Sequence, residues 1–414
     1  MENQTLLSVT EAKQRILSQF EPKNPIRIEL RDALGCVLAT DINAPMDSPP
    51  FDNSSMDGFA VKAQDCGHAD PNHPVHLAVV ADIPAGQKPQ VKIERGQAAR
   101  IMTGAQLPAG ADAVIPVELT SVSDRYNRTE LPESVEIYQT AQPGQNVRPA
   151  GQDIRQGQVV LKSGHLLKPH DLGFLAGMGI THIYSFPKPT IALFSSGDEL
   201  VSPGQTLGDG QVYDINSLSI SLLLQSFGAN VLELGVAADT YSAVQALLQK
   251  AVELHADMIV STAGVSLGVY DFVKQVVTEN GSLNFWKVNM RPGKPLTFGS
   301  FGNQNIPFIG LPGNPVSAYV SSRIFIRPII YKLLGRAFTE TLGEAVLGEE
   351  VHSDGRESYL RVELVEKDGL PYAKLAQHQG SGNMYSLVCA NALLIIPAGV
   401  KSLAKGSRAK IISI

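Results

Sequence analysis

The sequence FIGLPGNPVS, residues 308–317, begins as an apolar run of strand length, passes through a glycine turn and ends as the start of a helix. Asn314 suits the N-cap of that helix, and Pro315 suits its first position because the N–H that proline lacks would be unsatisfied there. The other N–H groups of a first helical turn carry the positive end of the helix dipole and bind phosphates or oxyanions. The stretch therefore indicates an anion site, although such a turn more often serves only as a loop.

From residue 190 onward the chain alternates between strand and helix. Apolar runs of strand length occur at 190–194, 231–236, 257–260 and 306–311, and stretches with helical spacing lie between them at 215–227, 241–254 and 273–279. Such alternation is typical of a parallel sheet covered by helices on both faces. Ligands of these sheets bind beyond the carboxyl ends of the strands, so candidate site residues should follow the strands directly.

The rest of the chain predicts two further helices and two mostly β regions. A capping box, Ser8–Glu11, begins a helix over residues 10–19, and helical spacing recurs over 168–178. Short β-prone runs fill residues 56–139, at 75–80, 98–102 and 113–119, and return after residue 335, at 359–365, 392–396 and 409–412. We expect an α/β-plus-β, multi-domain chain: a discontinuous N-terminal domain (1–50 and 140–182), a small β domain (51–139), an α/β domain (183–334) and a C-terminal β domain (335–414).

The composition is that of a globular protein outside the membrane. The 414 residues are 43% hydrophobic and 18% charged, and no apolar run approaches the roughly 18 residues of a membrane span. The N-terminus lacks the pattern of a signal peptide, and the three cysteines form neither a disulfide framework nor a zinc motif, so we expect a cytoplasmic protein. A net charge of −6 disfavours nucleic acid as a partner, and any anionic ligand requires a local positive patch.

Acidic residues follow the strands of the expected sheet. Glu199 comes after the first strand, Asp239 after the second and Asp271 a little beyond the third. Acids beside a phosphate-binding turn would repel the ligand unless a hard cation such as Mg²⁺ lay between them. These residues are therefore candidate Mg²⁺ ligands, although each one alone could cap a helix or solvate a loop.

Basic residues gather between the third and fourth strands of this region. Lys274 lies on the expected helix, and Lys287, Arg291 and Lys294 follow in the sequence WKVNMRPGKP, residues 286–295. Prolines on both sides stiffen the backbone at Lys294, which favours a phosphate clamp over a mobile surface lysine. The alternative interpretation is an ordinary basic loop.

Seven motifs run through the chain in order. They are FDNSSMDGFAV (51–61), RIMTGA (100–105), GQDI (151–154), SSGDEL (195–200), AGVSLGVYDFVK (263–274), RPGKP (291–295) and GLPGNPVSA (310–318). Together they resemble the molybdopterin molybdenumtransferase family, which also includes the C-terminal part of gephyrin. The resemblance implies an enzyme of molybdenum cofactor biosynthesis that inserts molybdate into adenylylated molybdopterin, with Mg²⁺ as cofactor and release of AMP.

The resemblance also implies residue roles. Asp57, Thr103, Asp153 and Glu199 would be catalytic, although turn chemistry alone would also explain Asp57 and Thr103, and Glu199, Asp239 and Asp271 would hold Mg²⁺. The substrate-binding residues would be Lys274, Lys287, Arg291, Lys294, Pro312, Gly313, Asn314, Pro315 and Ser381.

At the level of the whole protein, the resemblance implies an elongated subunit with an α/β domain of the molybdopterin-binding type. It further implies a homodimer whose active cleft lies between the α/β domain of one chain and the β domain of the other. Its partners would be a molybdopterin adenylyltransferase and the proteins that deliver the cofactor to molybdoenzymes.

The chain departs from the family pattern at four positions: Phe59, where Tyr is familiar, Ala238, where a second Asp can occur, Ala263, where Gly is common, and Arg291, where Lys is usual. Arg291 keeps the positive charge but changes the donor geometry. Two other functions compete with metal insertion: a scaffold that anchors a peptide of another protein, and the preceding adenylylation of molybdopterin. The lack of a long linker disfavours the scaffold, and an adenylylating enzyme would not need the domain that carries Asp57.

Overall fold

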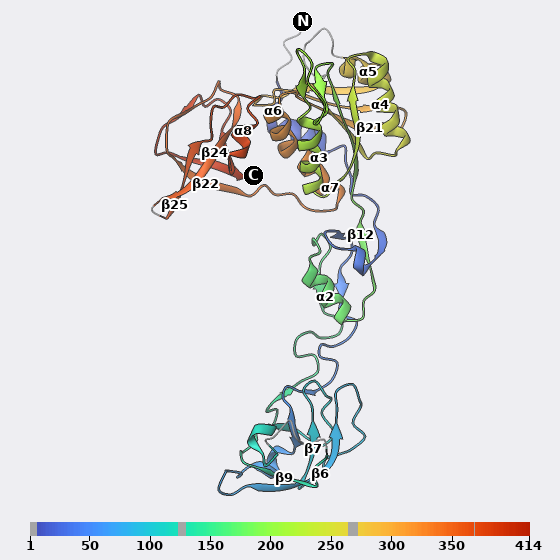
Figure 1. Ribbon diagram of the computed structural model, residues 1–414, viewed down its shortest axis with the longest axis vertical. Coiled ribbons are helices and arrows are strands. Elements are labelled where there is room, and N and C mark those ends of the chain that lie inside the picture. Colours follow the sequence, from blue (N-terminus) through green and yellow to red (C-terminus); the bar gives the residue numbers. More distant parts are fainter. Residues whose placement is uncertain (1–5, 123–129, 264–271, 368) are drawn as a thin grey trace. The chain divides into compact units, whose positions relative to one another are not determined.

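The computed structural model describes residues 6–122, 130–263, 272–367 and 369–414. The chain divides into two compact units, and Figure 1 labels several of their helices and strands. The larger unit comprises Met1–Thr40, Gly164–Leu172 and His182–Ile414, and the smaller unit comprises Asp41–Ser163 and Gly173–Thr181. Within the described ranges, no helix is long and apolar enough to cross a membrane.

A six-stranded sheet forms the centre of the larger unit. Its strand order is β16 (Asn230–Ala237), β13 (Thr190–Ser196), β17 (Met258–Thr262), β21 (Ile306–Leu311), β20 (Pro295–Phe301) and β18 (Gly281–Lys287). The first four strands are parallel, which confirms the prediction. The last two strands are antiparallel and were not predicted. Their glycines explain the omission: a Cβ added at Gly281 would lie 1.9 Å from the Ser300 carbonyl oxygen, and one at Gly299 would lie 2.1 Å from that of Ser282.

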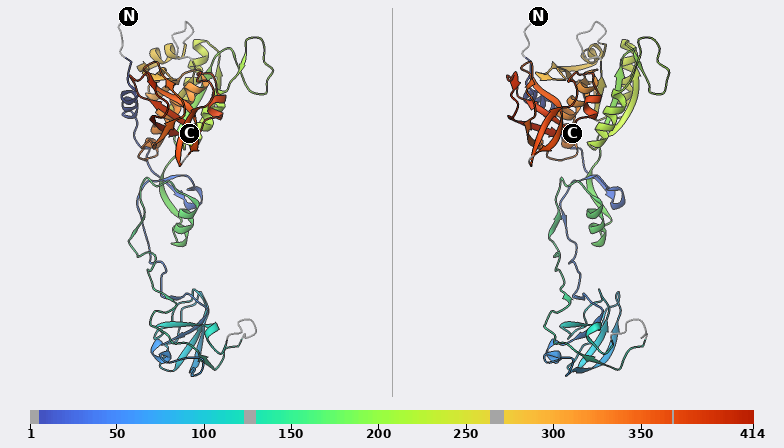
Figure 2. Two further views of the ribbon diagram at one scale, coloured as in Figure 1. Left: turned by 90° about the vertical axis from the view of Figure 1, so that its left-hand side faces the viewer. Right: turned by 60° about the vertical axis from the view of Figure 1, so that its left-hand side comes forward.

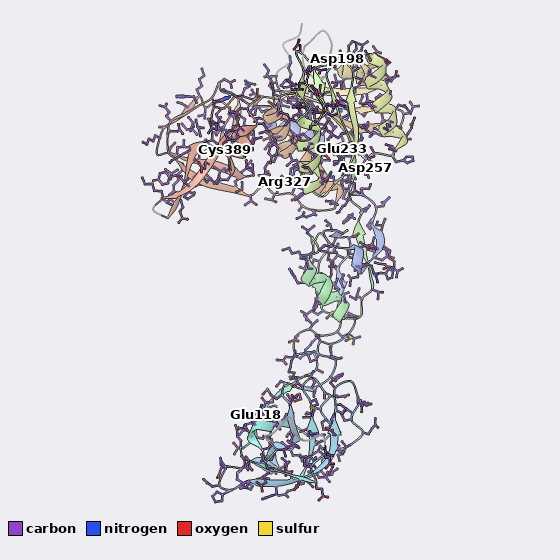
Figure 3. The ribbon with its side chains drawn as sticks, viewed as in Figure 1. Glu118, Asp198, Glu233, Asp257, Arg327 and Cys389 are labelled. Carbon is purple, nitrogen blue, oxygen red and sulfur yellow. The ribbon has the colours of Figure 1, made fainter. Side chains whose placement is uncertain are left out.

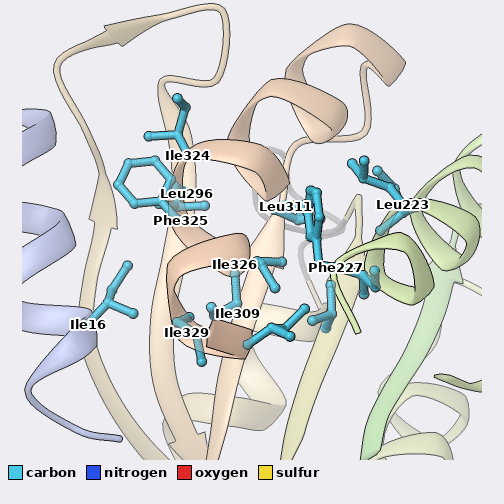
Figure 4. Packing of buried hydrophobic residues seen from close by; sticks show 14 of the residues in the cluster. Ile16, Leu223, Phe227, Leu296, Ile309, Leu311, Ile324, Phe325, Ile326 and Ile329 are labelled. Atoms are coloured by element: carbon cyan, nitrogen blue, oxygen red, sulfur yellow. The ribbon is translucent and has the colours of Figure 1, made fainter. Parts of the chain in front are cut away.

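Helices cover both faces of this sheet (Figure 2). One face packs against α1 (Val9–Leu17), α3 (Asn216–Ser226), α6 (Pro315–Ser321), a π-helical turn (Ser322–Ile326) and α7 (Arg327–Leu333). The other face packs against α4 (Tyr241–Glu253) and α5 (Phe272–Asn280). Successive strand residues point to opposite faces, so Leu193 belongs to the first core and Phe194 to the second. Figure 4 shows the first core, which contains Ile309 of β21, Ile326 and Ile329.

The N-terminal helix α1 begins with the predicted capping box. Glu11 N donates to Ser8 Oγ at 3.1 Å, and Ser8 N donates to Glu11 Oε2 at 2.9 Å. The helix ends at Leu17, two residues before the predicted end, and its buried Ile16 joins the first core. After α1 the larger unit contains a three-stranded sheet of β1 (Ile26–Glu29), β12 (His182–Phe186) and β2 (Val37–Leu38).

The C-terminal strands of the larger unit close into a barrel. β24 (Glu357–Lys367), β25 (Leu370–Leu375), β22 (Leu342–Leu347), β28 (Arg408–Ser413) and β26 (Ala392–Ile396) pair in that order, and β26 pairs back to β24. The three strands predicted for this region, at 359–365, 392–396 and 409–412, correspond to β24, β26 and β28. The short strand β19 (Met290–Arg291) pairs in parallel with β24, and Tyr359 and Leu393 of the barrel belong to the first core of the α/β sheet. The barrel is therefore fixed against the α/β part of the same unit.

A second β sheet forms the smaller unit. Its order is β8 (Ala113–Pro116), β5 (Gly58–Val61), β7 (Gln97–Ile101), β6 (Val75–Ile83) and β9 (Ser134–Ile137), and the three predicted strands are among them. Two ribbons accompany the sheet, β4 (Asn53–Ser54) with β10 (Val147–Arg148) and β3 (Ile42–Asn43) with β11 (Val159–Leu161). Helix α2 spans Pro169–Gly177, within the predicted range. The borders of the four expected domains stay a prediction.

Candidate functional site

A cationic pocket of about 290 Å³ lies in the larger unit, where the start of α6, the loop before β20 and the C-terminal barrel meet. Four basic side chains line it, and none of the described residues in its wall is acidic. The lining residues are Arg291, Pro292, Gly293, Lys294, Pro295, Asn314, Ser317, Arg356, Leu360, Arg361, Gln379, Gly380 and Ser381. The structure thus brings together four of the candidates from the sequence: Arg291, Lys294, Asn314 and Ser381.

The loop that carries Lys294 approaches α6 closely because it contains glycine. Gly293 has a φ of 101°, and a Cβ added there would lie 2.5 Å from Ser321 Oγ. Arg291 is held at the other end of this loop, where its backbone pairs with Ser358 of β24. The loop therefore presents both basic residues to the pocket from a fixed backbone.

Arg361 is the most deeply buried cation of the pocket, with 1% of its surface exposed. Its Nε donates to Ser386 Oγ at 3.0 Å and its Nη2 donates to the Gly380 carbonyl oxygen at 3.0 Å. Among the residues that the structure describes, no carboxylate forms an ion pair with it. Burial, with a further contribution from Arg291, lowers the pKa of Arg361 to about 10, so the side chain is charged at neutral pH. A buried charge requires a counter-charge, and the pocket offers the place for an anionic one.

Arg356 differs from Arg361 because it has its own carboxylate. Its Nε and Nη2 donate to Asp354 Oδ2 at 3.0 and 2.5 Å, and its Nη1 donates to the Met290 carbonyl oxygen at 3.0 Å. The hydrogen bonds from Arg356 lower the pKa of Asp354 to about 2. Sequence analysis missed both arginines; the signal for Arg361 was a charged residue in the middle of an apolar strand.

The start of α6 differs in part from the expectation. Asn314 occupies the N-cap position and Pro315 the first helical position, as expected. However, no side-chain cap hydrogen bond from Asn314 occurs in the described part of the chain, and the Val316 N–H donates to the Ser381 carbonyl oxygen at 3.1 Å. The expected row of free N–H groups is therefore wrong at Val316, because the protein itself uses that donor. The groups that this pocket offers to an anion are therefore mainly side chains.

Five substrate-binding candidates in the described ranges do not line this pocket: Lys274, Lys287, Pro312, Gly313 and Pro315. Lys274 lies in the first turn of α5, and Lys287 is the last residue of β18. Gly313 has a structural contact instead, because its carbonyl oxygen accepts from Asn216 Nδ2 at 2.7 Å.

An acidic cluster lies at the carboxyl ends of β13 and β16 (Figure 3 labels Asp198). Asp239 N donates to Asp198 Oδ1 at 3.0 Å, and burial, Asp198 and Glu199 raise the pKa of Asp239. Glu199 folds over Gly197, where an added Cβ would lie 2.7 Å from Glu199 Oε2. The third metal candidate, Asp271, lies outside the described residues. Within the described ranges, no three acidic, histidine or cysteine side chains converge closely enough to hold an ion.

A buried network connects the ends of β13 and β17. Ser195 Oγ is 2.6 Å from Thr262 Oγ1 and 3.0 Å from Ser217 Oγ, and Ser217 Oγ donates to Asp214 Oδ2 at 2.5 Å. Sequence analysis missed Asp214, which precedes α3 in the sequence YDIN. The network fixes the end of β13, from which Asp198 and Glu199 extend.

The smaller unit brings two of its three candidates together. Thr103 donates to Asp57 Oδ1 from both its backbone N and its Oγ1, each at 2.7 Å. Asp153 instead accepts from Arg148 Nη2 at 2.9 Å, in a half-exposed ion pair. The short strand β4 pairs with Arg148 through Asn53.

Comparison with known proteins agrees with this architecture. The families described as MoeA N-terminal region (domain I and II), probable molybdopterin binding domain, and MoeA C-terminal region (domain IV) match residues 7–179, 192–332 and 344–414. The chain is 36% identical to the molybdopterin molybdenumtransferase of Nostoc sp. over 92% of this chain and 86% of that protein. It is 35% identical to molybdopterin molybdenumtransferase 2 of Mycobacterium tuberculosis over 98% of each. The chain belongs to the molybdopterin molybdenumtransferase family.

The fold of this molybdopterin molybdenumtransferase family member also matches a solved structure. The crystal structure of the molybdopterin biosynthesis MoeA protein from Pyrococcus horikosii superimposes with a TM-score of 0.84 and 32% sequence identity, covering 99% of each chain. The structure explains one departure from the family pattern, Phe59, and shows why glycine is common at position 263, although nothing in it explains the alanine. Ala263 has a φ of 71°, in the left-handed region that glycine favours, and Phe59 is fully buried in the core of the smaller sheet, where a hydroxyl would need a partner.

Proposed function

We propose that this protein transfers molybdenum from molybdate to the dithiolene sulfurs of adenylylated molybdopterin, with cleavage of the phosphoanhydride and release of AMP. The observation that carries the proposal is Arg361, a buried cation without a carboxylate partner in the described chain, in a pocket with three other basic residues. In a chain with a net charge of −6, such a pocket is suited to an oxyanion. Molybdate and the phosphate groups of the adenylylated cofactor are both oxyanions.

The residues of the cationic pocket would bind and orient these oxyanions. Arg361 presents a guanidinium that is already fixed by Ser386 and Gly380, so little side-chain entropy is lost when an anion binds. Lys294 and Arg291 add charge from the opposite loop. This arrangement would stabilise negative charge that develops on the reacting oxygens and would hold the reactants in position.

The acidic cluster is suited to Mg²⁺. Carboxylate oxygens are its preferred protein ligands, and burial, together with repulsion from Asp198 and Glu199, raises the pKa of Asp239. Glu199 and Asp239 would hold the ion, with Asp271 as the third candidate. One or two carboxylates are enough, because Mg²⁺ usually completes its shell with water and phosphate oxygens. When bound, the ion would neutralise charge on the phosphoanhydride.

The proposal includes the quaternary structure that the family resemblance implies. In a cytoplasmic homodimer, Asp57, Thr103 and Asp153 of one chain would face the cationic pocket of the other chain and would complete the active cleft. The hydrogen bonds of Thr103 to Asp57 support this role because they fix one carboxylate oxygen in place. A molybdopterin adenylyltransferase would supply the substrate, and delivery proteins would take the product to molybdoenzymes.

The test is a single-turnover assay with purified protein, adenylylated molybdopterin, Mg²⁺ and molybdate. We expect AMP release and recovery of activity in a molybdenum-free apo-enzyme, with both signals lost in Asp57→Asn, Glu199→Gln and Arg361→Gln. The absence of both signals with the folded wild-type protein would favour the scaffold function. AMP transfer to molybdopterin that survives Asp57→Asn, without molybdenum insertion by the wild type, would favour adenylylation.

A further inference from the structure

A second cavity, of about 450 Å³, lies in the larger unit and shares no lining residue with the cationic pocket. Its walls are α1, α7 and the segment 336–340 that follows α7. The two helices form a rigid frame, because Ile16 of α1 and Ile329 of α7 are both fully buried in the first core (Figure 4). The cavity volume lies within the range of about 300–1,000 Å³ that is typical of small-molecule sites.

Two of the basic residues in this cavity lack a charge partner. Lys13 and Arg336 form no ion pair or side-chain hydrogen bond with any residue that the structure describes. Lys13 is half-buried, and this burial lowers its pKa, although Glu340 and Glu357 oppose the effect. The guanidinium of Arg336 lies over the ring of Tyr331, with its Cζ 4.4 Å from the ring centroid. Arg336 is therefore stabilised by the Tyr331 ring and Lys13 by the nearby charges of Glu340 and Glu357, and neither cation has a hydrogen-bonded counter-ion among the described residues.

The one acidic residue in the cavity wall, Glu340, is ion-paired through one carboxylate oxygen, while its other oxygen, Oε2, is buried without a hydrogen-bond partner among the described residues. Glu340 Oε1 accepts from Arg327 Nη1 at 3.3 Å, and Arg327 is itself held between aromatic rings, including that of Phe338 at 5.3 Å (Figure 3 labels Arg327). The third basic residue, Lys332, donates to the Leu17 carbonyl oxygen at 3.0 Å and lies 3.6 Å from the exposed Glu21. The remaining charge of the cavity is positive.

The cavity lining also includes three apolar residues, Leu17, Pro328 and Phe338. A lining that combines basic groups with aromatic and aliphatic surface suits a ligand with an anionic head and an apolar body. We propose that this cavity binds a phosphate monoester that carries an apolar or aromatic group. Lys13 and Arg336 hold the phosphate, Lys332 adds charge, and the organic group lies against Phe338 and Pro328.

Calorimetric titration of the full chain with phenyl phosphate tests the proposal. Inorganic phosphate, which lacks the apolar body, and phenol, which lacks the charge, serve as comparison ligands. Lys13→Met and Arg336→Met should each weaken phenyl phosphate binding by about tenfold or more, because each removes a charged hydrogen-bond donor. Lys250→Met, at an exposed lysine of α4, should leave this binding event unchanged, and Lys294→Met reports any separate binding of phenyl phosphate in the cationic pocket.

Thermal unfolding of each variant shows whether it is folded. We expect Lys13→Met and Arg336→Met to fold, because neither side chain forms an ion pair with a described residue. If one of these two variants fails to fold, the phenyl phosphate affinity of the other still tests the proposal. Binding that is lost only in Lys294→Met would assign phenyl phosphate to the cationic pocket and overturn the proposal. Equal affinity in wild type, Lys13→Met and Arg336→Met, or phenol binding as tightly as phenyl phosphate, would overturn it as well. Bromine anomalous scattering from 4-bromophenyl phosphate in crystals should give a peak beside Phe338.

Discussion

Replacing Arg361 by methionine separates a structural role of this arginine from an anion-binding role. Burial and Arg291 lower its pKa from 12.5 to about 10, which corresponds to a cost of roughly 3 kcal/mol for keeping the side chain charged in the folded protein. The hydrogen bonds to Ser386 and Gly380 return roughly 1.5 kcal/mol each, the lower end of the range for charged donors. These contributions nearly cancel. We therefore expect Arg361→Met to change the free energy of unfolding by less than about 1 kcal/mol, as measured by urea denaturation.

Anion binding should respond very differently to the same substitution. Removing one partner of a buried charge pair costs about 2–5 kcal/mol, so molybdate affinity measured by titration calorimetry should fall at least about thirtyfold. Arg408→Met is the matched control, because Arg408 is an exposed arginine of the same barrel, 3.7 Å from the exposed Glu344, and should change neither quantity. A loss of more than about 3 kcal/mol in stability, together with undiminished molybdate affinity, would show that Arg361 is a structural residue.

Three further substitutions test other parts of the larger unit. Gly293→Ala should lower the free energy of unfolding by at least about 2 kcal/mol, because the φ of Gly293 is 101° and the added Cβ would lie 2.5 Å from a hydroxyl oxygen. Gly35→Ala, at φ 71° and with no atom near the added Cβ, should lower it by about 1 kcal/mol. Equal urea midpoints for the two variants would contradict this prediction. Lys23→Met should cost about 1–3 kcal/mol, because it leaves Asp257 without the ammonium that donates to both its oxygens, and adding Asp257→Asn should recover part of the loss in thermal unfolding. Burial and neighbouring carboxylates raise the pKa of Asp239, so its negative charge destabilises the folded protein as the pH rises above 3.8. At pH 7 without Mg²⁺, Asp239→Asn should therefore be more stable than the wild type by up to about 1 kcal/mol. A melting temperature below that of the wild type would refute this prediction.

Local sequence signals predicted the parts of the fold that depend on local interactions. The capping box placed the start of α1 correctly, and the four long apolar runs became the four parallel strands, because a strand that is buried on both faces needs apolar residues throughout. The strands β18 and β20 were missed, because their glycines permit a close antiparallel approach that no apolar pattern announces.

The cationic pocket depends on contacts between residues far apart in the chain, and for that reason the sequence predicted only part of it. Gly380 and Ser386 hold the guanidinium of Arg361 in the pocket wall, and nothing in the local sequence of β24 indicates these partners. The loop before β20 was predicted because its prolines and glycine are themselves a local signal. The sequence therefore indicated Arg291, Lys294, Asn314 and Ser381, and it did not indicate Arg356 or Arg361.

The contact between Val316 and Ser381 determines which groups the proposed anion site can use. A site made of backbone N–H groups at a helix start is insensitive to most side-chain substitutions, because every residue except proline supplies the same donor. In this chain the Val316 donor is used by the Ser381 carbonyl oxygen, and Pro315 has none. The charge that holds an oxyanion must therefore come from Arg361, Lys294 and their neighbours, whose effects can be removed one side chain at a time. Substitutions in this pocket should consequently weaken anion binding in separate steps while the start of α6 stays folded.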